Sequence, residues 1–131
     1  MNKVKAVVLA GVIGVGVLGS STAYARNVAN FSTTVGRLNG SGYTGNLVKV
    51  HSNDPAICNN SSIGGGYKMD VRIQRPDGSQ SSSWVKLTSG SRVSIPNKIG
   101  SGLSTRLHFS NDLTTPVNVQ VSGSWSPDTK N

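Results

Sequence analysis

The sequence predicts a small all-β protein, a small antiparallel β-sandwich of about seven strands. Apolar and polar residues alternate with period two in several segments, and no helical periodicity follows residue 25. Clusters of glycine, proline, asparagine and serine separate these segments. Period-two alternation is typical of strands that bury one face. Short strands separated by turn residues are typical of sandwiches and barrels.

Residues 67–75 are the clearest strand, and Pro76-Asp77-Gly78 then predict a turn. Residues 83–87 read as its partner strand, with Trp84 and Lys86 on one face. A core position is the more common one for tryptophan, but an exposed Trp84 beside Lys86 would suit contact with carbohydrate or a membrane interface. In the first strand the apolar side is Tyr67, Met69, Val71 and Ile73, and the polar side is Lys68, Asp70, Arg72 and Gln74.

A second hairpin is expected from residues 103–109 and 117–121, with Trp125 continuing the apolar face. Shorter strands are expected at residues 30–35, 47–51 and 92–95, and loops at residues 36–46 and 52–66. The loop at 52–66 is long for a compact domain, and loops of this length are usually functional or disordered.

The N-terminus has the three parts of a secretory signal peptide. Lys3 and Lys5 precede an uncharged apolar run at residues 6–18, and Ala23 and Ala25 form a small-residue cleavage site. The run is too short for a bilayer-spanning helix, which needs about 20 residues. We therefore expect residues 1–25 to be removed and residues 26–131 to form a single β-sandwich domain.

Charge and cysteine content limit the environment of this domain. The chain has 13 basic and 5 acidic residues, and removal of Lys3 and Lys5 leaves a net charge of +6. A basic secreted protein meets anionic surfaces first, and the alternative interpretation is solubility, since a net charge of this size is ordinary for a small soluble domain. The chain has a single cysteine, Cys58, so no intramolecular disulfide can form. Cys58 lies in the expected loop at 52–66 and either stays free or pairs between chains. Small secreted domains usually contain disulfides, so their absence fits export from a Gram-positive bacterium better than a eukaryotic secretory route.

Catalytic signals are weak. A nucleophilic pair of Cys58 with His51 or His108 is conceivable, but no known catalytic motif surrounds these residues. His51, Asp54 and Cys58 lack the paired spacing of a zinc site. We expect no enzyme activity, no metal and no cofactor.

The outward positions of the predicted strands offer a basic stripe, provided that the two hairpins share a sheet. Lys49 is a further contributor, and the alternative is an ordinary solvated face. The candidate binding residues are Lys68, Arg72, Lys86, Arg106 and His108.

The C-terminal third resembles a family of small secreted proteins of unknown function from Gram-positive bacteria. The family pattern ends in valine, serine, glycine and an aromatic residue, followed by an acid. Here that segment is residues 121–128, with Ser124 inserted before Trp125 and with Asp128 as the acid. The strand at residues 103–109 and the turn containing Asn111 also fit. The resemblance implies a secreted β domain, and it implies no activity and no functional residue.

Two functions follow from these features. The first is a secreted basic protein that binds an anionic cell-wall polymer, a membrane surface or an extracellular protein, without catalysis. The alternative is a bacteriocin-like antimicrobial protein that acts on bacterial membranes. Nucleic acid is not an expected partner outside the cell.

Overall fold

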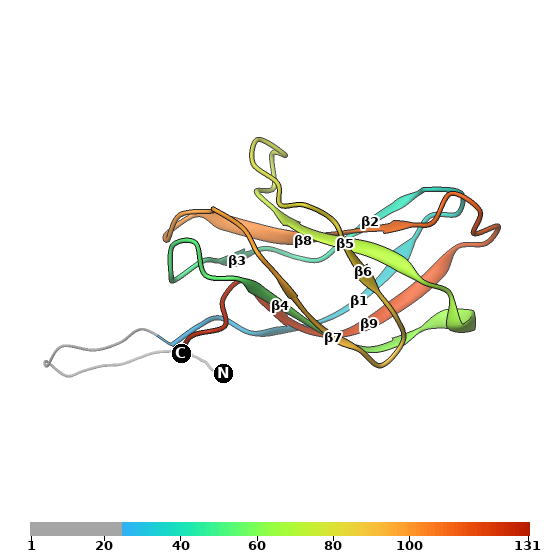
Figure 1. Ribbon diagram of the computed structural model, residues 1–131, viewed down its shortest axis with the longest axis horizontal. Coiled ribbons are helices and arrows are strands. Elements are labelled where there is room, and N and C mark those ends of the chain that lie inside the picture. The colour runs from blue at the N-terminus through green and yellow to red at the C-terminus, as the bar shows by residue number, and fades with distance from the viewer. Residues whose placement is uncertain (1–24) are drawn as a thin grey trace, which may run out of the picture.

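The computed structural model describes residues 25–131, and their strands form two antiparallel sheets packed face to face (Figure 1). This confirms the predicted all-β sandwich, with nine strands rather than about seven. The strands are β1 Ala29–Val35, β2 Ser41–Tyr43, β3 Leu47–Val48, β4 Ala56–Ile63, β5 Met69–Gln74, β6 Val85–Leu87, β7 Arg92–Ile95, β8 Ser104–Asn111 and β9 Val119–Ser126. A 3-10 turn, η1 (Gly64–Gly66), joins β4 to β5.

The chain crosses from one sheet to the other at most of its connections. The first sheet has the strand order β1-β9-β4-β7, and the second has the order β2-β8-β5-β6 with β3 also paired to β8. The predicted hairpin around Pro76-Asp77-Gly78 is confirmed as β5 and β6. The second predicted hairpin is wrong, because β8 pairs with β2, β3 and β5 while β9 pairs with β1 and β4. Alternation shows which residues face inward, but it does not show which sheet a strand joins.

The inward positions form one core between the sheets. Met69, Val71 and Ile73 of β5 are fully buried, as the period-two pattern predicts. Trp125 of β9 is also buried, whereas Val117 lies before β9 begins and is exposed. The other members of the core include Phe31, Val35, Ala56, Cys58, Ile63, Leu87, Ile95, Ile99, Leu107, Phe109, Val119 and Val121.

Both predicted loops contain strands. Most of the segment at residues 52–66 is the eight-residue strand β4, which pairs with β9 on one side and β7 on the other. Its asparagine and serine residues misled the prediction: Asn59, Ser61 and Ser62 point to solvent, and Asn60 donates its side-chain N–H to the carbonyl of Thr88. The segment at 36–46 contains β2, and the strand predicted at 47–51 ends at Val48.

The turn between β1 and β2 has an unusual residue in it. Leu38 and Asn39 both have positive φ, at 54° and 67°, and the Gly40 N–H donates to the Arg37 carbonyl at 3.1 Å. Two central residues with positive φ are the mark of a type I′ hairpin turn, which favours Asn-Gly. Asparagine tolerates this conformation, but for leucine it costs about 1–2 kcal/mol.

The predicted signal peptide lies, apart from Ala25, outside the described residues. Within residues 25–131, no helix has the length and apolar character needed to cross a membrane.

Candidate binding face

One row of side chains crosses the outer face of the second sheet. Tyr43 of β2 and Arg72 of β5 both sit opposite His108 of β8 in the strand register. Trp84, which precedes β6, continues the row, because its neighbour Val85 pairs with Val71. Arg106 lies two residues before His108 on β8 and opposite Gln74. We call Tyr43, Arg72, Trp84, Arg106 and His108 the aromatic–arginine cluster.

Each arginine of the cluster lies over an aromatic ring. The guanidinium carbon of Arg72 is 4.2 Å from the centre of the Trp84 ring, and that of Arg106 is 3.9 Å from the centre of the Tyr43 ring. His108 lies between the two aromatic residues, stacked on Tyr43 with ring centres 4.6 Å apart and edge-on to Trp84 at 4.9 Å. Cation–π contacts of this kind contribute about 0.5–1 kcal/mol each at exposed sites, so the packing holds both arginines in place.

The protonation of His108 follows from its neighbours. Nε of Arg72 is 3.2 Å from Nδ1 of His108, and a guanidinium can only donate, so Nδ1 accepts. The ring proton is therefore on Nε2, which donates to the hydroxyl of Ser41 at 2.8 Å. Burial, together with the positive charges of Arg72 and Arg106, lowers the pKa of His108 to about 4. His108 is thus neutral at pH 7 and serves as a spacer between two cations.

Both arginines keep hydrogen-bonding capacity for a ligand. Nε of Arg106 donates to the side-chain oxygen of Gln74 at 2.9 Å, just as Nε of Arg72 donates to His108. Within residues 25–131, neither guanidinium forms an ion pair or donates its terminal N–H groups to a protein acceptor. Terminal guanidinium N–H groups match carboxylate, sulfate and phosphate oxygens in a bidentate manner.

All five acidic residues of the chain are engaged elsewhere. Asp70 and Asp112 both pair with Lys86, at 3.1 and 2.8 Å, and Asp77 accepts from the backbone of Ser79 in its own turn. Asp54 accepts hydrogen bonds from Thr129 and Lys130, and Asp128 accepts one from Lys49. The charge of Arg72 and Arg106 is therefore not neutralised within the domain.

The structure separates the other predicted binding residues from the cluster. Lys86 shares the face but is held between Asp70 and Asp112. Lys68 is exposed and precedes β5. The suggestion that Lys49 joins the stripe is wrong, because Lys49 is buried, 3.2 Å from Asp128, and also donates to the carbonyls of Asp54 and Pro127.

The buried charges around Lys49 attach the C-terminus to the sandwich. Asp128 accepts from the backbone N–H groups of Val50 and His51 as well as from Lys49. Asp54 accepts from Thr129 and Lys130. Burial raises the pKa of Asp54, but these hydrogen bonds outweigh it and the pKa lies below its ordinary value. This cluster satisfies its own charges and is structural.

Two groupings resemble catalytic pairs but lack their chemistry. Ser41 and His108 are in contact, yet the histidine nitrogen that faces Ser41 carries the proton and two arginines disfavour an imidazolium, so His108 is a poor general base. Cys58 faces the core from β4, and burial raises its pKa to about 12. Its thiol is therefore not a nucleophile at neutral pH. Residues 25–131 hold no cluster of three metal-ligating side chains.

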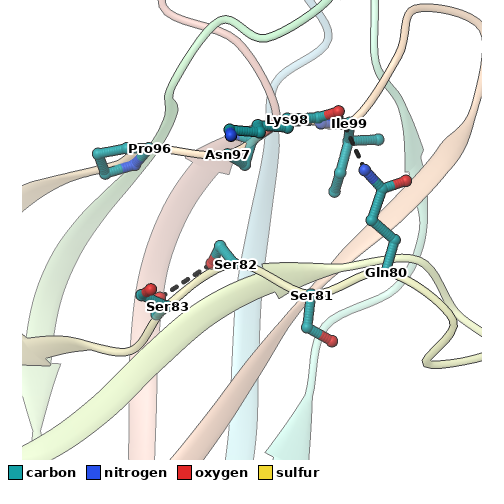
Figure 2. Close-up of a pocket in the computed structure, with 8 residues that line it drawn as sticks. All are labelled: Gln80, Ser81, Ser82, Ser83, Pro96, Asn97, Lys98 and Ile99. Carbon is teal, nitrogen blue, oxygen red and sulfur yellow. Dashed lines mark hydrogen bonds between the residues drawn. The ribbon is translucent and has the colours of Figure 1, made fainter.

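A shallow groove of about 410 Å³ lies where residues 80–83 face residues 96–99 (Figure 2). The Gln80 side chain spans it and donates to the carbonyl of Lys98 at 3.0 Å. Its lining is neutral apart from Lys98, so it offers a ligand little beyond hydrogen bonds. It is lined by Gln80, Ser81, Ser82, Ser83, Pro96, Asn97, Lys98 and Ile99.

Tyr43 and Trp84 complete the cluster, although the sequence did not single out Tyr43 and favoured a core position for Trp84. Both rings are about two-fifths exposed, 42% and 41%. The parity that Trp84 shares with Lys86 was the available signal for Trp84, whereas Tyr43 lies in a three-residue strand too short to show alternation.

No protein-family model, curated protein or solved structure matches this chain.

Proposed function

We propose that this protein is an exported binding module, without catalysis, whose aromatic–arginine cluster holds an anionic cell-surface polymer. The observation that carries the proposal is the pair of fixed arginines with no acid beside them. No arginine of residues 25–131 forms an ion pair, and Arg72 and Arg106 are the two that are packed over aromatic rings. Here each one is held by an aromatic ring and a neutral hydrogen-bond acceptor, which leaves its charge for a partner.

The geometry favours a polymer over a single small anion. Arg72 and Arg106 are diagonal neighbours on adjacent strands, a relationship that places side chains about 7–8 Å apart at their base. Two successive acidic groups of a chain suit this spacing better than one carboxylate does. The exposed parts of Trp84 and Tyr43 add apolar surface for sugar rings.

The sequence features of residues 1–25 support export, and an exported basic domain would meet anionic cell-surface polymers. Secreted wild-type protein that begins at Arg26 is the result expected from N-terminal sequencing. A start at Met1 would contradict this part of the proposal.

Retention on dextran sulfate resin and on purified bacterial cell walls tests the binding. We expect Arg72→Gln with Arg106→Gln to lose at least tenfold in affinity. The same variant should melt several degrees lower, because two cation–π contacts of about 0.5–1 kcal/mol each are removed, so retention is compared well below both melting temperatures. Wild-type retention should fall as salt rises from 0.01 to 0.15 M, over which the screening length shortens from about 30 to about 8 Å.

A charge-matched control separates a specific site from net charge. Arg92 lies on β7 of the first sheet and Lys130 lies in the C-terminal segment, and both are exposed, so Arg92→Gln with Lys130→Gln removes the same charge. Equal losses in the two double variants would contradict the proposed site. If removal of the wall protein abolished retention on cell walls, the partner would be an acidic protein, and the proposed polymer ligand would be wrong.

A further inference from the structure

Three aliphatic side chains are exposed together at one end of the sandwich. Leu38 lies on the β1–β2 turn, and Leu113 and Val117 lie on the β8–β9 loop, with exposed fractions of 56%, 72% and 45%. Figure 1 shows the two loops side by side at this end of the molecule. The Leu38 N–H donates to the Thr115 carbonyl at 2.8 Å and the Asn39 N–H to the Asp112 carbonyl at 3.3 Å. We call Leu38, Leu113 and Val117 the apolar tip.

The residue choice at Leu38 argues that the tip is selected for more than folding. Leucine is disfavoured at a φ of 54°, and here it also gives up most of the burial that usually favours it. Asn-Gly would form the same turn without strain. Residues held in strained conformations cluster at functional sites. Here the residue with the strained backbone, Leu38, also exposes an apolar side chain to water.

The charges around the tip indicate its partner. Arg37 is exposed and precedes Leu38 in the turn. Lys68 is also exposed and directly precedes Met69, which pairs with Asn111, the last residue before the β8–β9 loop. Within residues 25–131 neither cation has an ion-pair partner, and the one acid of the β8–β9 loop, Asp112, is held by Lys86. Aliphatic side chains flanked by unpaired cations fit the boundary between acyl chains and anionic headgroups.

We propose that the apolar tip docks this protein on anionic membranes, with Leu38 and Leu113 entering the lipid interface. The backbone hydrogen bonds between the two loops fix the side chains before contact, so little order has to be gained on binding. This site is distinct from the aromatic–arginine cluster, which lies on the sheet face rather than at its end.

Flotation with phosphatidylglycerol–phosphatidylcholine vesicles, compared with phosphatidylcholine vesicles, tests the docking. Wild type should float with the anionic vesicles only. Leu38→Asn with Leu113→Ser should weaken this binding roughly tenfold or more. Asparagine tolerates positive φ, so the variant should melt at or above the wild-type temperature and its loss cannot be ascribed to unfolding. Val48→Ser removes an aliphatic side chain that is 45% exposed from β3, away from the tip, and should bind like wild type.

A fluorescent label separates insertion at the tip from attraction to the charged face. Cys58 is buried and should stay unlabelled, so Leu113→Cys takes one environment-sensitive dye. Its emission should shift to the blue on anionic vesicles, also in the background of Arg72→Gln with Arg106→Gln, and the same dye on Val48→Cys should not shift. Wild type that does not float, tip variants that float unchanged, or bound protein without a shift at position 113 would each overturn the proposal. Binding of the tip to an apolar protein surface in place of lipid would overturn it as well.

Discussion

The two outer faces of the sandwich are built on the same period-two alternation and carry different chemistry. Among the strand residues of the first sheet only Arg92, on the edge strand β7, is charged. The outward residues are otherwise mainly serine, threonine, asparagine and glutamine. The second sheet presents Arg72, Arg106 and His108 with two exposed aromatic rings. We call these the neutral face and the cationic face.

The faces also differ in how they satisfy hydrogen bonds. On the neutral face, Thr34 donates to Gln120 at 2.8 Å, Gln120 donates to Ser32 at 2.6 Å, and the hydroxyls of Ser62 and Ser122 are 3.1 Å apart. On the cationic face the arginines bond through Nε alone and leave their terminal N–H groups to solvent or a ligand. A face whose polar groups satisfy one another has little to offer a partner, so binding should be confined to the cationic face and the tip.

The largest effect should come from the first sheet, where the backbone is tightest. A Cβ on Gly123 would lie 2.2 Å from the Asn59 carbonyl oxygen, next to the β-bulge between β9 and β4. Gly123→Ala should therefore cost about 3 kcal/mol or more in the free energy of unfolding, measured by urea denaturation. Gly45→Ala, whose Cβ would meet no atom within 4 Å, is the matched control and should change stability little. Equal stability of the two variants would contradict the described packing of β4 on β9.

A smaller loss is expected at Cys58. Its predicted place in a polar loop implied a dispensable residue, but it is buried between Trp125 and Val93 on neighbouring strands. Cys58→Ser should cost about 1–3 kcal/mol, because the new hydroxyl is buried without an assured partner. For a domain of this size that lowers the melting temperature by several degrees or more.

Thiol titration checks the burial of Cys58 independently of stability. Ellman's reagent should not react with the folded protein at neutral pH, and it should react fully in denaturant. Rapid reaction in the folded state, or a disulfide-linked dimer on a non-reducing gel, would show that β4 is not a central strand.

The fold was largely predictable and the cluster only partly so. Alternation in residues 67–75 predicted the faces of β5 correctly, because its apolar residues are large and its polar residues mostly charged. In β4 the pattern is hidden, since Asn60 is buried through a hydrogen bond and Cys58 packs as an apolar residue. Arg72, Arg106 and His108 were found from strand parity. Their contact with Tyr43 depends on the pairing of β2 with β8, which is a long-range choice that local sequence does not encode.

The charge arrangement of the cationic face predicts a pH dependence. The pKa of His108 is about 4 in the fold, below its ordinary value of 6.5. Between these values the unfolded chain binds more protons than the folded one, so stability is fully present above about pH 6.5 and falls as the pH approaches 4. The loss is at most about 3 kcal/mol. Asp54 also has a lowered pKa, so its stabilising contribution is present above about pH 4 and is lost only below that value.

Urea denaturation at a series of pH values measures this effect. His108→Gln should flatten the stability profile between pH 6.5 and 4 relative to wild type. An identical slope in both proteins would show that His108 is not confined between Arg72 and Arg106.

The smallest effect is expected on the neutral face. Ser32→Ala with Gln120→Ala removes two members of its hydrogen-bonded row at exposed positions. The melting curve should move by less than about 0.5 kcal/mol per substitution, and retention on dextran sulfate should match wild type. A loss of retention would indicate that the polymer binds the neutral face and would contradict its assignment to the cationic face.

Nuclear magnetic resonance titration with dextran sulfate compares both faces in one experiment. The predicted result is a set of saturable shifts at the Trp84 indole N–H, the Tyr43 ring and the Arg72 and Arg106 side chains, with the amides around Ser32, Ser122 and Gln120 unchanged and neutral dextran without effect. Shifts spread evenly over both faces, or confined to the neutral face, would contradict the assignment of binding to the aromatic–arginine cluster.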